Sequence, residues 1–243
     1  MALNTSNVIV GAANCAVGQY SLDYVATGDQ AWTAIKSAVG AGKDFRGWIT
    51  GLAGSTGTPT NVSVVGTGVS GAAYGNVTPA GYISFKDAGL TQSGIEIQYN
   101  PDYGEVEVDQ LLDTAKLFKQ KMTVMVVTTF AEATLQNLLA VWSQEAGTLY
   151  TDTGTLASST GALVSGGSLG AAPIEKCLVF VGNAPNTQTS YKQRVYVATR
   201  AISVEQSNHA LRRAEATLFP VTFRLLPDTF ASYSSYGRVV DIT

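Results

Sequence analysis

Three short glycine-containing motifs have residue types and spacings that occur in catalytic and phosphate-binding sites. The run "GTGVSG" at 66–71 fits the G-x-G-x-x-G pattern that binds a pyrophosphate, and "GAGKD" at 40–44 resembles part of a P-loop. The run "GGSLG" at 166–170 fits the G-x-S-x-G pattern of a hydrolase nucleophile, and His209 follows it in hydrolase order. Each chemistry depends on the element that flanks the motif.

None of the three motifs has the flanking element that its chemistry needs. The run "AAYGNVTPAG" after the first motif cannot form the helix whose N-terminus would hold a pyrophosphate. In the P-loop-like run, Ser37 replaces the first glycine and Asp44 replaces the hydroxyl residue that binds magnesium. Pro173 breaks the helix required after the third motif. We therefore expect no enzyme activity, no cofactor and no metal site, with His209, the only histidine, in a surface loop.

A row of acidic residues is the most unusual chemical feature of the chain. In "YNPDYGEVEVDQL" at 99–111, Glu105, Glu107 and Asp109 occupy alternate positions, so on a strand they would project from one face. Like charges in a row repel each other. The row therefore requires either water or a function.

The composition limits what that function can be. Charged residues make up 14% of the 243 residues, below the roughly 25% usual for soluble globular proteins. A surface with so few charges suggests that partners cover much of it. The net charge of −3 and the pI near 5.1 argue against the basic surface that tight binding of nucleic acid needs.

The amino-terminal run and the two cysteines indicate where the protein resides. The run "MALNTSNVIVGAANCAVG" has no cationic segment ahead of its apolar residues and falls short of the roughly 20 apolar residues that cross a membrane. We therefore expect a cytosolic protein without membrane contact. Cys15 and Cys177 lie far apart without a CxxC partner, which favours two buried, reduced thiols.

Most of the chain is expected to form strands. The runs "SGIEIQY" at 93–99 and "GEVEVDQL" at 104–111 flank "NPDY", which predicts a hairpin with Pro101 in its turn and Glu96 on the partner strand of the acidic row. A polar, helix-leaning connection follows at 111–121, and "MTVMVVTTF" at 122–130 is apolar on nearly both faces, as in a central strand. Further strands are expected at 7–13, 81–87, 175–182, 191–204, 215–226 and 237–243, with Pro220 marking a bulge or an edge strand.

One helix is expected within "TTFAEATLQNLLAVWSQEAG" at 128–147. Thr129 and Glu132 have the spacing of a capping box, and Gly147 is placed to end the helix. Four apolar side chains at i, i+3, i+4 and i+7 form the face expected to contact the core: Leu135, Leu138, Leu139 and Trp142.

We expect a single domain over residues 1–243 with about eight strands and one helix. Residues 40–81 are rich in Gly, Ser, Thr and Ala and are interrupted by Pro59 and Pro79, so they are too long for an ordinary connection. We interpret them as part of an insertion at about 28–80, formed by short strands of its own or by an ordered surface loop.

Three segments resemble the major tail tube protein of tailed bacteriophages. They are "GIEIQYNPDYGEVEVDQ", "KMTVMVVTTFAEATLQNLLAV" and "EATLFPVTFRLLPD", with "YG" nearer the end. In that family an acidic "VDQ" strand, an apolar strand leading into an "AE.TL.NL" helix and a terminal "F.V.FR.LPD" strand occur in this order. The resemblance covers 7–27, about 83–146 and 174–243, whereas the glycine-rich segment at 28–80 departs from compact members of the family.

The resemblance implies a β-sandwich or partial barrel with one flanking α-helix. Six copies would close a ring with a continuous β-barrel as its inner wall, and rings would stack into the hollow tail tube that conducts genomic DNA into the host. The implied partners are copies of the chain in hexameric rings, the tape-measure protein, the baseplate or tail tip, the tail terminator and, in a contractile tail, a sheath protein. The implied location is the virion tail, assembled in the host cytoplasm.

The resemblance also suggests a function for the acidic row. DNA carries about one negative charge per 1.7 Å of duplex axis, so an acidic wall repels it and lets it pass without tight binding. The candidates for a wall that faces the lumen are Glu96, Glu105, Glu107 and Asp109. The candidates for a loop that contacts the adjacent ring are Asp113, Lys116, Lys119 and Lys121.

A different class of function remains open. A carbohydrate-binding or capsid-decoration β-sandwich would also be rich in glycine and in strands. Such a protein should show clustered exposed aromatic residues, whereas Trp32, Trp48 and Trp142 are scattered along the sequence. The oligomeric state separates the two classes, because a tube protein must associate with itself.

Overall fold

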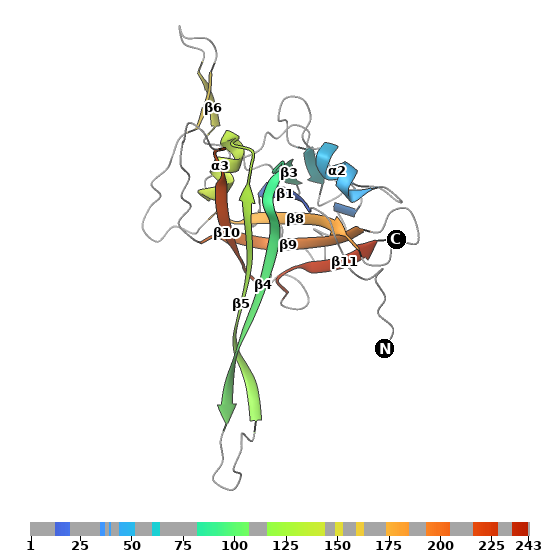
Figure 1. Ribbon diagram of the computed structural model, residues 1–243, viewed down its shortest axis with the longest axis vertical. Helices are drawn as coiled ribbons and strands as arrows, with labels where there is room; N and C mark the ends of the chain where they lie inside the picture. The colour runs from blue at the N-terminus through green and yellow to red at the C-terminus, as the bar shows by residue number, and fades with distance from the viewer. Residues whose placement is uncertain are drawn as a thin grey trace.

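The protein is mainly β in the computed structural model (Figure 1). Two short helices are described, α2 (Phe45–Gly51) and α3 (Leu135–Val141), and neither is long enough to cross a membrane. Strands β6 (Leu149–Asp152) and β7 (Ser159–Ala162) pair with each other apart from the main sheet. The structure describes residues 13–19, 35–36, 39, 44–51, 60–63, 82–106, 116–143, 149–152, 159–162, 174–184, 193–204, 216–227 and 235–242.

The other described strands form one open antiparallel sheet in the order β2-β3-β1-β8-β9-β10-β5-β4, with β11 paired to β9 beside β10. The strands expected at 81–87, 175–182, 191–204, 215–226 and 237–243 are confirmed. The bounds are β1 (Asn14–Gln19), β2 (Thr60–Ser63), β3 (Tyr82–Asp87), β4 (Thr91–Val106), β5 (Lys116–Phe130), β8 (Lys176–Asn183), β9 (Gln193–Ser203), β10 (Phe219–Leu225) and β11 (Arg238–Ile242).

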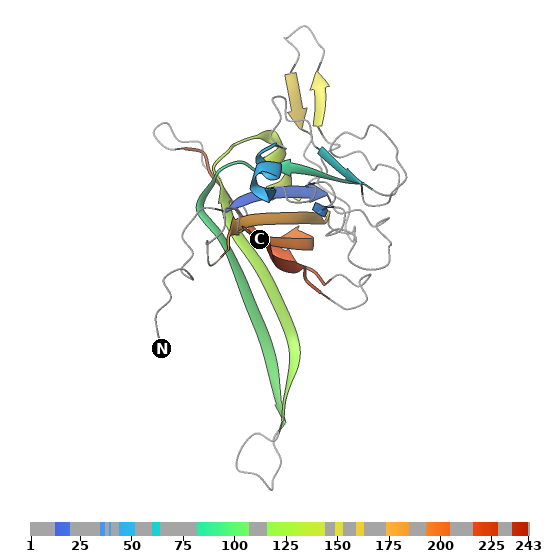
Figure 2. The same ribbon diagram turned by 90° about the vertical axis from the view of Figure 1, so that its right-hand side faces the viewer.

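The sheet curls so strongly that a short segment of chain joins its two ends. Strands β3 and β4 lie near opposite ends of the strand order, yet only residues 88–90 connect them. Three residues span about 10 Å, so the two ends must meet at this connection. Strands β4 and β5 consequently run steeply across β8 and β9, as Figure 1 and Figure 2 show. The open sheet is therefore wrapped around one of its own cores.

Strands β1, β8 and β9 pack against one hydrophobic core with one face and against a second core with the other. The first core contains Val179 and Phe85 together with side chains of α2. The second core lies inside the curl, where Phe180 of β8 joins side chains of β5 and β10. The first six residues of β8 are consequently buried, as is typical of a strand covered on both faces. Cys177 lies in the first core and Cys15 in the second, both as free thiols, which confirms the expectation for the cysteines.

Part of the glycine-rich segment contributes to the first core. Asp44 caps α2, because its side chain accepts a hydrogen bond from the N–H of Arg46 at 2.9 Å. Gln193 of β9 binds both the Asp44 side chain and the N–H of Phe45. Phe45 and Ile49 are buried in the core. The segment for which we expected short strands or a surface loop thus supplies a helix that is bound to the sheet, as well as strand β2.

Pro220 lies inside the sheet at a position where β10 has a partner on only one side. It pairs with Thr129 of β5, whereas β10 pairs with β9 only over Phe223–Leu225. A proline lacks the N–H that a second neighbouring strand would need. The local edge explains why the proline is tolerated.

The connection between β3 and β4 turns sharply at Gly89. Its φ is +77°, and its N–H donates to the Asp87 carboxylate at 2.9 Å. The carboxylate of Glu132 accepts from the N–H of Leu90 at 3.1 Å and fills the space that a side chain on Gly89 would need. A larger residue at this position fits neither the backbone conformation nor the space.

Asn137 of α3 fixes the same connection from inside the protein. Its side chain is buried and donates to the carbonyl oxygens of Ala88 at 2.8 Å and Glu132 at 2.9 Å. The N–H of Ala88 in turn donates to the carbonyl of Cys15 at 2.8 Å. Three separate parts of the chain are thus hydrogen-bonded where the β3–β4 connection brings the two ends of the open sheet close together.

Helix α3 begins later than the sequence indicated. Its N-cap is Thr134, whose side chain accepts from the N–H of Asn137 at 3.2 Å. The expected capping box of Thr129 and Glu132 is wrong, because Thr129 pairs with β10 as part of β5. Pairing within the sheet holds this threonine in an extended conformation, and Glu132 binds the β3–β4 connection instead.

The apolar face expected on the helix is only partly buried. Leu139 is fully buried, and Leu138 and Trp142 pack against the second core. Leu135, in the first turn, is exposed. Trp142 is the C-cap residue, and the expected stop at Gly147 lies outside the described residues.

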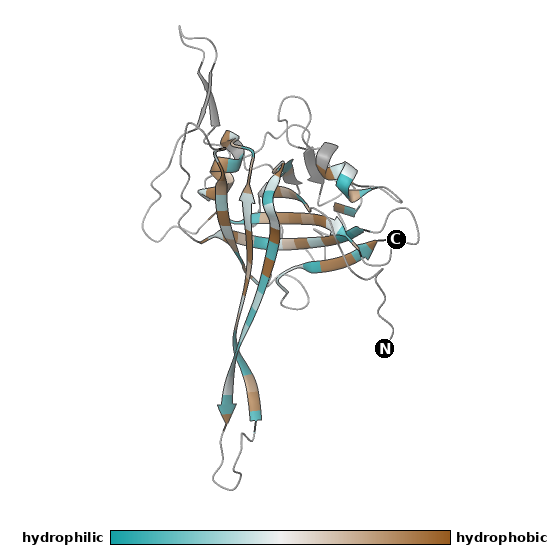
Figure 3. Ribbon diagram, in the orientation of Figure 1, coloured by the Kyte–Doolittle hydropathy of each residue, from teal (hydrophilic) through white to brown (hydrophobic). Residues whose placement is uncertain are grey.

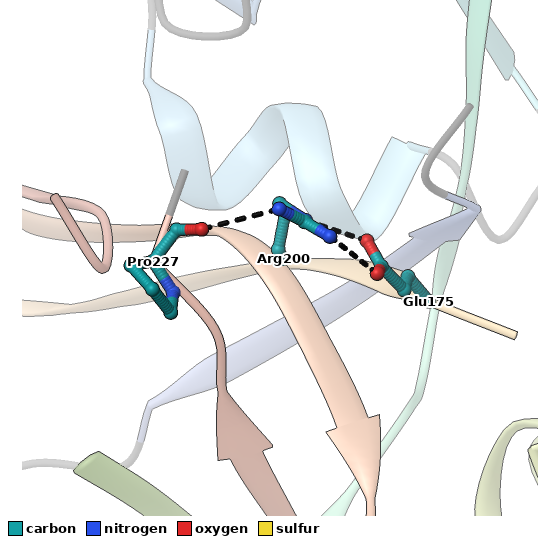
Figure 4. A network of polar contacts seen from close by, with 3 residues as sticks. All are labelled: Glu175, Arg200 and Pro227. Carbon is teal, nitrogen blue, oxygen red and sulfur yellow. Dashed lines mark hydrogen bonds and ion pairs between the residues drawn. The ribbon is translucent and has the colours of Figure 1, made fainter. Parts of the chain in front are cut away.

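Arg200 of β9 joins the start of β8 to the end of β10 (Figure 4). Its Nε and Nη2 atoms each lie 2.6 Å from the carboxylate of Glu175, and Nη1 donates to the carbonyl of Pro227 at 3.2 Å. Only 16% and 14% of the two charged side chains are exposed. A bidentate pair of this kind fixes the mutual position of three neighbouring strands.

We expect Asn137→Ala to lower the free energy of unfolding by about 1–3 kcal/mol, because it leaves buried carbonyl groups without their donor. Urea denaturation measures the change. Ala133→Ser, at an exposed position in the same segment, is the control and should change the value by less than about 0.5 kcal/mol. An Asn137→Ala protein as stable as the control would contradict the importance of these bonds.

A second prediction compares two bidentate pairs that differ in burial. Asp241 of β11 binds Arg194 of β9 at 2.6 and 2.7 Å, but this pair is considerably more exposed. We expect Glu175→Gln to cost about 1.5–3 kcal/mol of stability and Asp241→Asn less than about 1 kcal/mol. Equal losses in urea denaturation would show that burial does not strengthen the Arg200 pair.

The exposed pair also gives a pH dependence with a defined sign. The Arg194 guanidinium holds the pKa of the Asp241 carboxyl below its usual range. The pair therefore stabilises the fold above the usual aspartate pKa, and this contribution is lost as the pH falls through the lowered value. The destabilisation caused by Asp241→Asn should consequently be largest at pH 7 and should shrink progressively as the pH falls below the usual aspartate pKa. A destabilisation that does not shrink as the pH falls would contradict this origin.

Candidate assembly surface

Strands β4 and β5 extend beyond the rest of the sheet as a two-stranded ribbon (Figure 1). Strand β10 pairs with β5 only as far as Met125, and β4 is the only described strand that pairs with the remainder of β5. We call residues 100–106 and 116–121 the arm. Figure 2 shows from the side that the arm projects away from the body. Most of its side chains are exposed.

The predicted hairpin within 93–111 is wrong. Residues 91–106 form the single strand β4, and its partner in the hairpin is β5. Pro101 does not form a turn but pairs with Met122 within the ribbon. A proline is tolerated there because β4 is the outermost strand of the described sheet and needs no donor on its free side.

Side chains alternate along the ribbon, so each of its faces carries every second residue of β4. Cross-strand pairs such as Tyr99 with Val124 and Asn100 with Thr123 place the residues of β5 on the same two faces. The apolar face carries Ile97, Tyr99, Tyr103 and Leu117, together with Lys119 and Glu105. The polar face carries Glu96, Gln98, Asn100, Asp102, Lys121 and Thr123, and near the end of β4 also Lys116 and the exposed apolar side chains of Val106 and Phe118.

The apolar face of the arm continues a face that is buried in the body. Val124 and Val126 of β5 lie on this face within the second core. Farther along the same face, Tyr99 is 59% exposed, Tyr103 55% and Leu117 60%. Figure 3 shows that the arm carries both hydrophobic and hydrophilic residues. The core-forming face is thus exposed where the ribbon leaves the body.

Lys119 contacts the aromatic part of the apolar face. Its ammonium group donates to the hydroxyl of Tyr99 at 3.2 Å and to the sulfur of Met122 at 2.6 Å. The same nitrogen lies 5.5 Å from the centre of the Tyr99 ring, within the range of a cation–π contact. The only described cation on this face therefore already has partners on it.

Phe118 covers a glycine on the opposite face near the tip. Gly104 is buried, and a side chain there would meet the ends of the Phe118 and Gln120 side chains. Gln120 is the extra residue of a bulge, since Asp102 pairs with Lys121 and Tyr103 with Lys119. The aromatic ring compensates for the missing side chain of the glycine.

The base of the arm is fixed to the body. The hydroxyl of Tyr236, just before β11, donates to the carbonyl of Met122 at 3.2 Å. Its half-buried ring packs against the second core. A second bulge lies in β4 at Ser93 and Gly94, both with positive φ, and Thr128 binds the Gly94 carbonyl at 3.0 Å. These contacts determine the direction in which the ribbon leaves the sheet.

The residues proposed for the lumen do not share one surface. Glu96 lies on the polar face and Glu105 on the apolar face, because they are nine positions apart in one strand and positions that differ by an odd number project from opposite faces. We expected Glu96 and Glu105 on one wall of the lumen. That arrangement requires the predicted hairpin within 93–111, which the structure replaces with the single strand β4. Glu107 and Asp109 lie outside the described residues, so their position stays a prediction.

The residues proposed for contact between rings belong to a strand where they are described. Lys116, Lys119 and Lys121 are exposed residues of β5, not of a loop, and Asp113 lies outside the described residues. Three carboxylates and three ammonium groups along the described ribbon make it formally neutral: Glu96, Asp102, Glu105, Lys116, Lys119 and Lys121. This portion of the ribbon is therefore not an acidic surface.

Sequence reasoning missed the apolar face and its support from Tyr236. The signal was present, because apolar residues occupy alternate positions from Ile95 to Tyr103. That alternation continues through Pro101 and so indicates one strand, whereas we took the proline as a turn. The contact of Tyr236 with the arm joins residues 114 positions apart and has no local signal.

Comparisons with known proteins provide no family assignment, since no protein-family model matches the chain and a search of curated proteins finds no match. Among the described residues, no group of three or more His, Cys, Asp or Glu side chains is placed to hold a metal ion.

We expect Tyr236→Phe to lower the free energy of unfolding by about 0.5–1.5 kcal/mol, because the carbonyl of Met122 loses its donor while the ring stays packed. Chemical denaturation measures the loss. Tyr103→Phe is the matched control: it changes an exposed tyrosine of the arm in the same way and should leave stability nearly unchanged. Equal effects of the two substitutions would show that Tyr236 does not support the arm.

Proposed function

We propose that the protein is a structural virion protein whose copies form hexameric rings that stack into a phage tail tube. The observation that carries this proposal is the arm, a ribbon with an exposed apolar face and no third strand among the described residues. The resemblance of three segments to tail tube proteins supports the same function. In that proposal the curled sheet is the partial barrel of the tail tube fold, and genomic DNA passes through the bore.

The physical chemistry of the arm favours association of the chain with itself. A two-stranded ribbon is marginally stable in water, and unpaired strand edges pair readily with other strands. The outer edge of β4 and the arm edge of β5 differ from each other, so joining one to the other gives a head-to-tail contact. Contacts of this kind close into rings at a fixed rotation. The low charge content of the chain favours extensive contact surfaces.

A monomeric carbohydrate-binding or decoration protein would not need these features. Exposed apolar surface and free strand edges are liabilities unless a partner covers them. The exposed aromatic residues of the described chain lie on the two-stranded ribbon, since Tyr99 and Tyr103 belong to β4 and Phe118 to β5. This arrangement favours the assembly function over the alternative.

The proposal predicts assembly of the purified chain without any other component. Sedimentation velocity should show species of about six chains or multiples of them as the concentration rises, and electron microscopy should show hollow stacked rings. The double substitution Tyr99→Ser and Tyr103→Ser should keep the chain folded and monomeric, because both side chains are exposed in the single copy. Asn100→Ser, on the polar face, is the control and should still assemble. A wild-type chain that remains monomeric at all concentrations would refute the function.

A further inference from the structure

We propose that Asp87 makes the β3–β4 connection sensitive to protons, and that uptake of one proton by its carboxylate holds the connection more firmly closed. Asp87 is the last residue of β3, and the connection at 88–90 brings the two ends of the open sheet close together. A change of charge at this point therefore acts on the joint from which β4 begins. The property belongs to the single copy and does not depend on assembly.

The carboxylate of Asp87 lies at the edge of a densely buried region. Phe85 and Ala88, which flank it in sequence, are buried, and Cys15 of the adjacent strand β1 is fully buried. Asp87 itself is half-buried, and its carboxylate accepts a hydrogen bond from the N–H of Gly89 at 2.9 Å. A carboxylate that has lost part of its water favours the neutral form unless hydrogen bonds or cations compensate for the loss.

A second carboxylate is held against the same three-residue connection. Glu132 accepts from the N–H of Leu90 at 3.1 Å and lies against Gly89. Consecutive Cα atoms are about 3.8 Å apart, so oxygens bound to adjacent N–H groups lie within roughly 10 Å of each other. Two negative charges repel over this distance, which is about one Debye length at physiological ionic strength. Glu132 is exposed, so water weakens this repulsion and the burial of Asp87 is the larger effect.

One cation offsets the two carboxylates only in part. Among the described residues, the titratable groups around Asp87 are Lys86 on the same strand, Glu132 and the thiol of Cys15. Burial raises the pKa of the Cys15 thiol, so this group stays neutral. Burial also lowers the pKa of Lys86, whereas both carboxylates favour its charged form. Protonation of Asp87 leaves one charge of each sign at the connection and removes the excess negative charge.

These surroundings determine the direction of the pH dependence. Burial, opposed by the N–H of Gly89 and reinforced by Glu132, raises the pKa of the Asp87 carboxyl above its usual value. The folded chain therefore binds this proton more tightly than the unfolded chain. The resulting stabilisation is complete below the usual aspartate pKa and is lost as the pH rises through the raised value. The sign is opposite for Asp241, because Arg194 lowers the pKa of that carboxyl.

Amide hydrogen exchange in dilute solution tests the proposal with two backbone reporters. The N–H of Ala88 donates to the carbonyl of Cys15, and the N–H of Ala131 donates to the carbonyl of Leu90, both at 2.8 Å. Neither hydrogen bond involves a carboxylate. The protection factors of both amides, resolved by NMR and corrected for the intrinsic effect of pH on exchange, report how often the connection opens. The wild type is compared from pH 7 to pH 4 with Asp87→Asn, which keeps a side-chain oxygen acceptor but cannot take up the proton.

We expect the protection of both amides in the wild type, measured relative to Asp87→Asn, to rise by at least about threefold from pH 7 to pH 4. Glu132→Gln keeps the acceptor for Leu90 but removes the second negative charge, so its rise should be smaller than that of the wild type. Glu96→Gln is the control, because this exposed carboxylate of β4 lies on the order of 20 Å along the strand from Leu90. It should show the same rise as the wild type.

Three results would overturn the proposal. Wild-type protection that stays constant or falls relative to Asp87→Asn would show that proton uptake does not close the connection. A rise that Glu96→Gln removes would assign the effect to the general charge of the surface. The third measurement needs no substitution and so does not depend on the folding of a variant: the carboxyl carbon of Asp87 is followed by NMR in the wild-type chain. Titration at or below the usual aspartate pKa would contradict the proposal, and titration above it supports the proposal.

Discussion

A two-stranded ribbon has no interior, and this constraint governs the β4–β5 arm. Within the body, one face of β5 is buried by side chains of β8 and β10, but the same face continues past Met125 without cover from any described strand. The cross-strand contacts between β4 and β5 stabilise such a ribbon only weakly. The exposed Tyr103 and Leu117 of the arm, with Tyr99 at its base, support the proposal that another copy completes a contact with this ribbon.

The body holds the arm through a small number of polar contacts. Asn137 and Glu132 fix the turn at Gly89, where β3 passes into β4, and Tyr236 binds β5 at the base of the arm. Arg200 joins β8, β9 and β10, the strands on which β5 is supported. Each contact joins segments distant in sequence, so together they set the direction of the ribbon relative to the curled sheet. A fixed direction is what a ring of identical copies requires.

The mainly β class, several strands and the two buried thiols could be predicted from the sequence, because alternating and continuous apolar runs are local signals. Prediction from the sequence failed at Pro101, since a proline at a free strand edge leaves the same local pattern as a proline in a turn. It also failed at Thr129, where pairing with β10 outweighs a capping motif. The curl of the sheet and the contact of Tyr236 with Met122 depend on residues far apart in the chain. No periodicity in the sequence could reveal them.

Hydrogen–deuterium exchange of the backbone amides, measured as a function of protein concentration, tests the central claim most directly. The account predicts that amides of the arm, at 100–106 and 116–121, exchange rapidly in dilute solution and become protected as the concentration rises. Amides of β8, buried on both faces in the single copy, should be protected throughout and should not change. Arm amides that exchange equally fast at every concentration would contradict the claim that a second copy completes the arm.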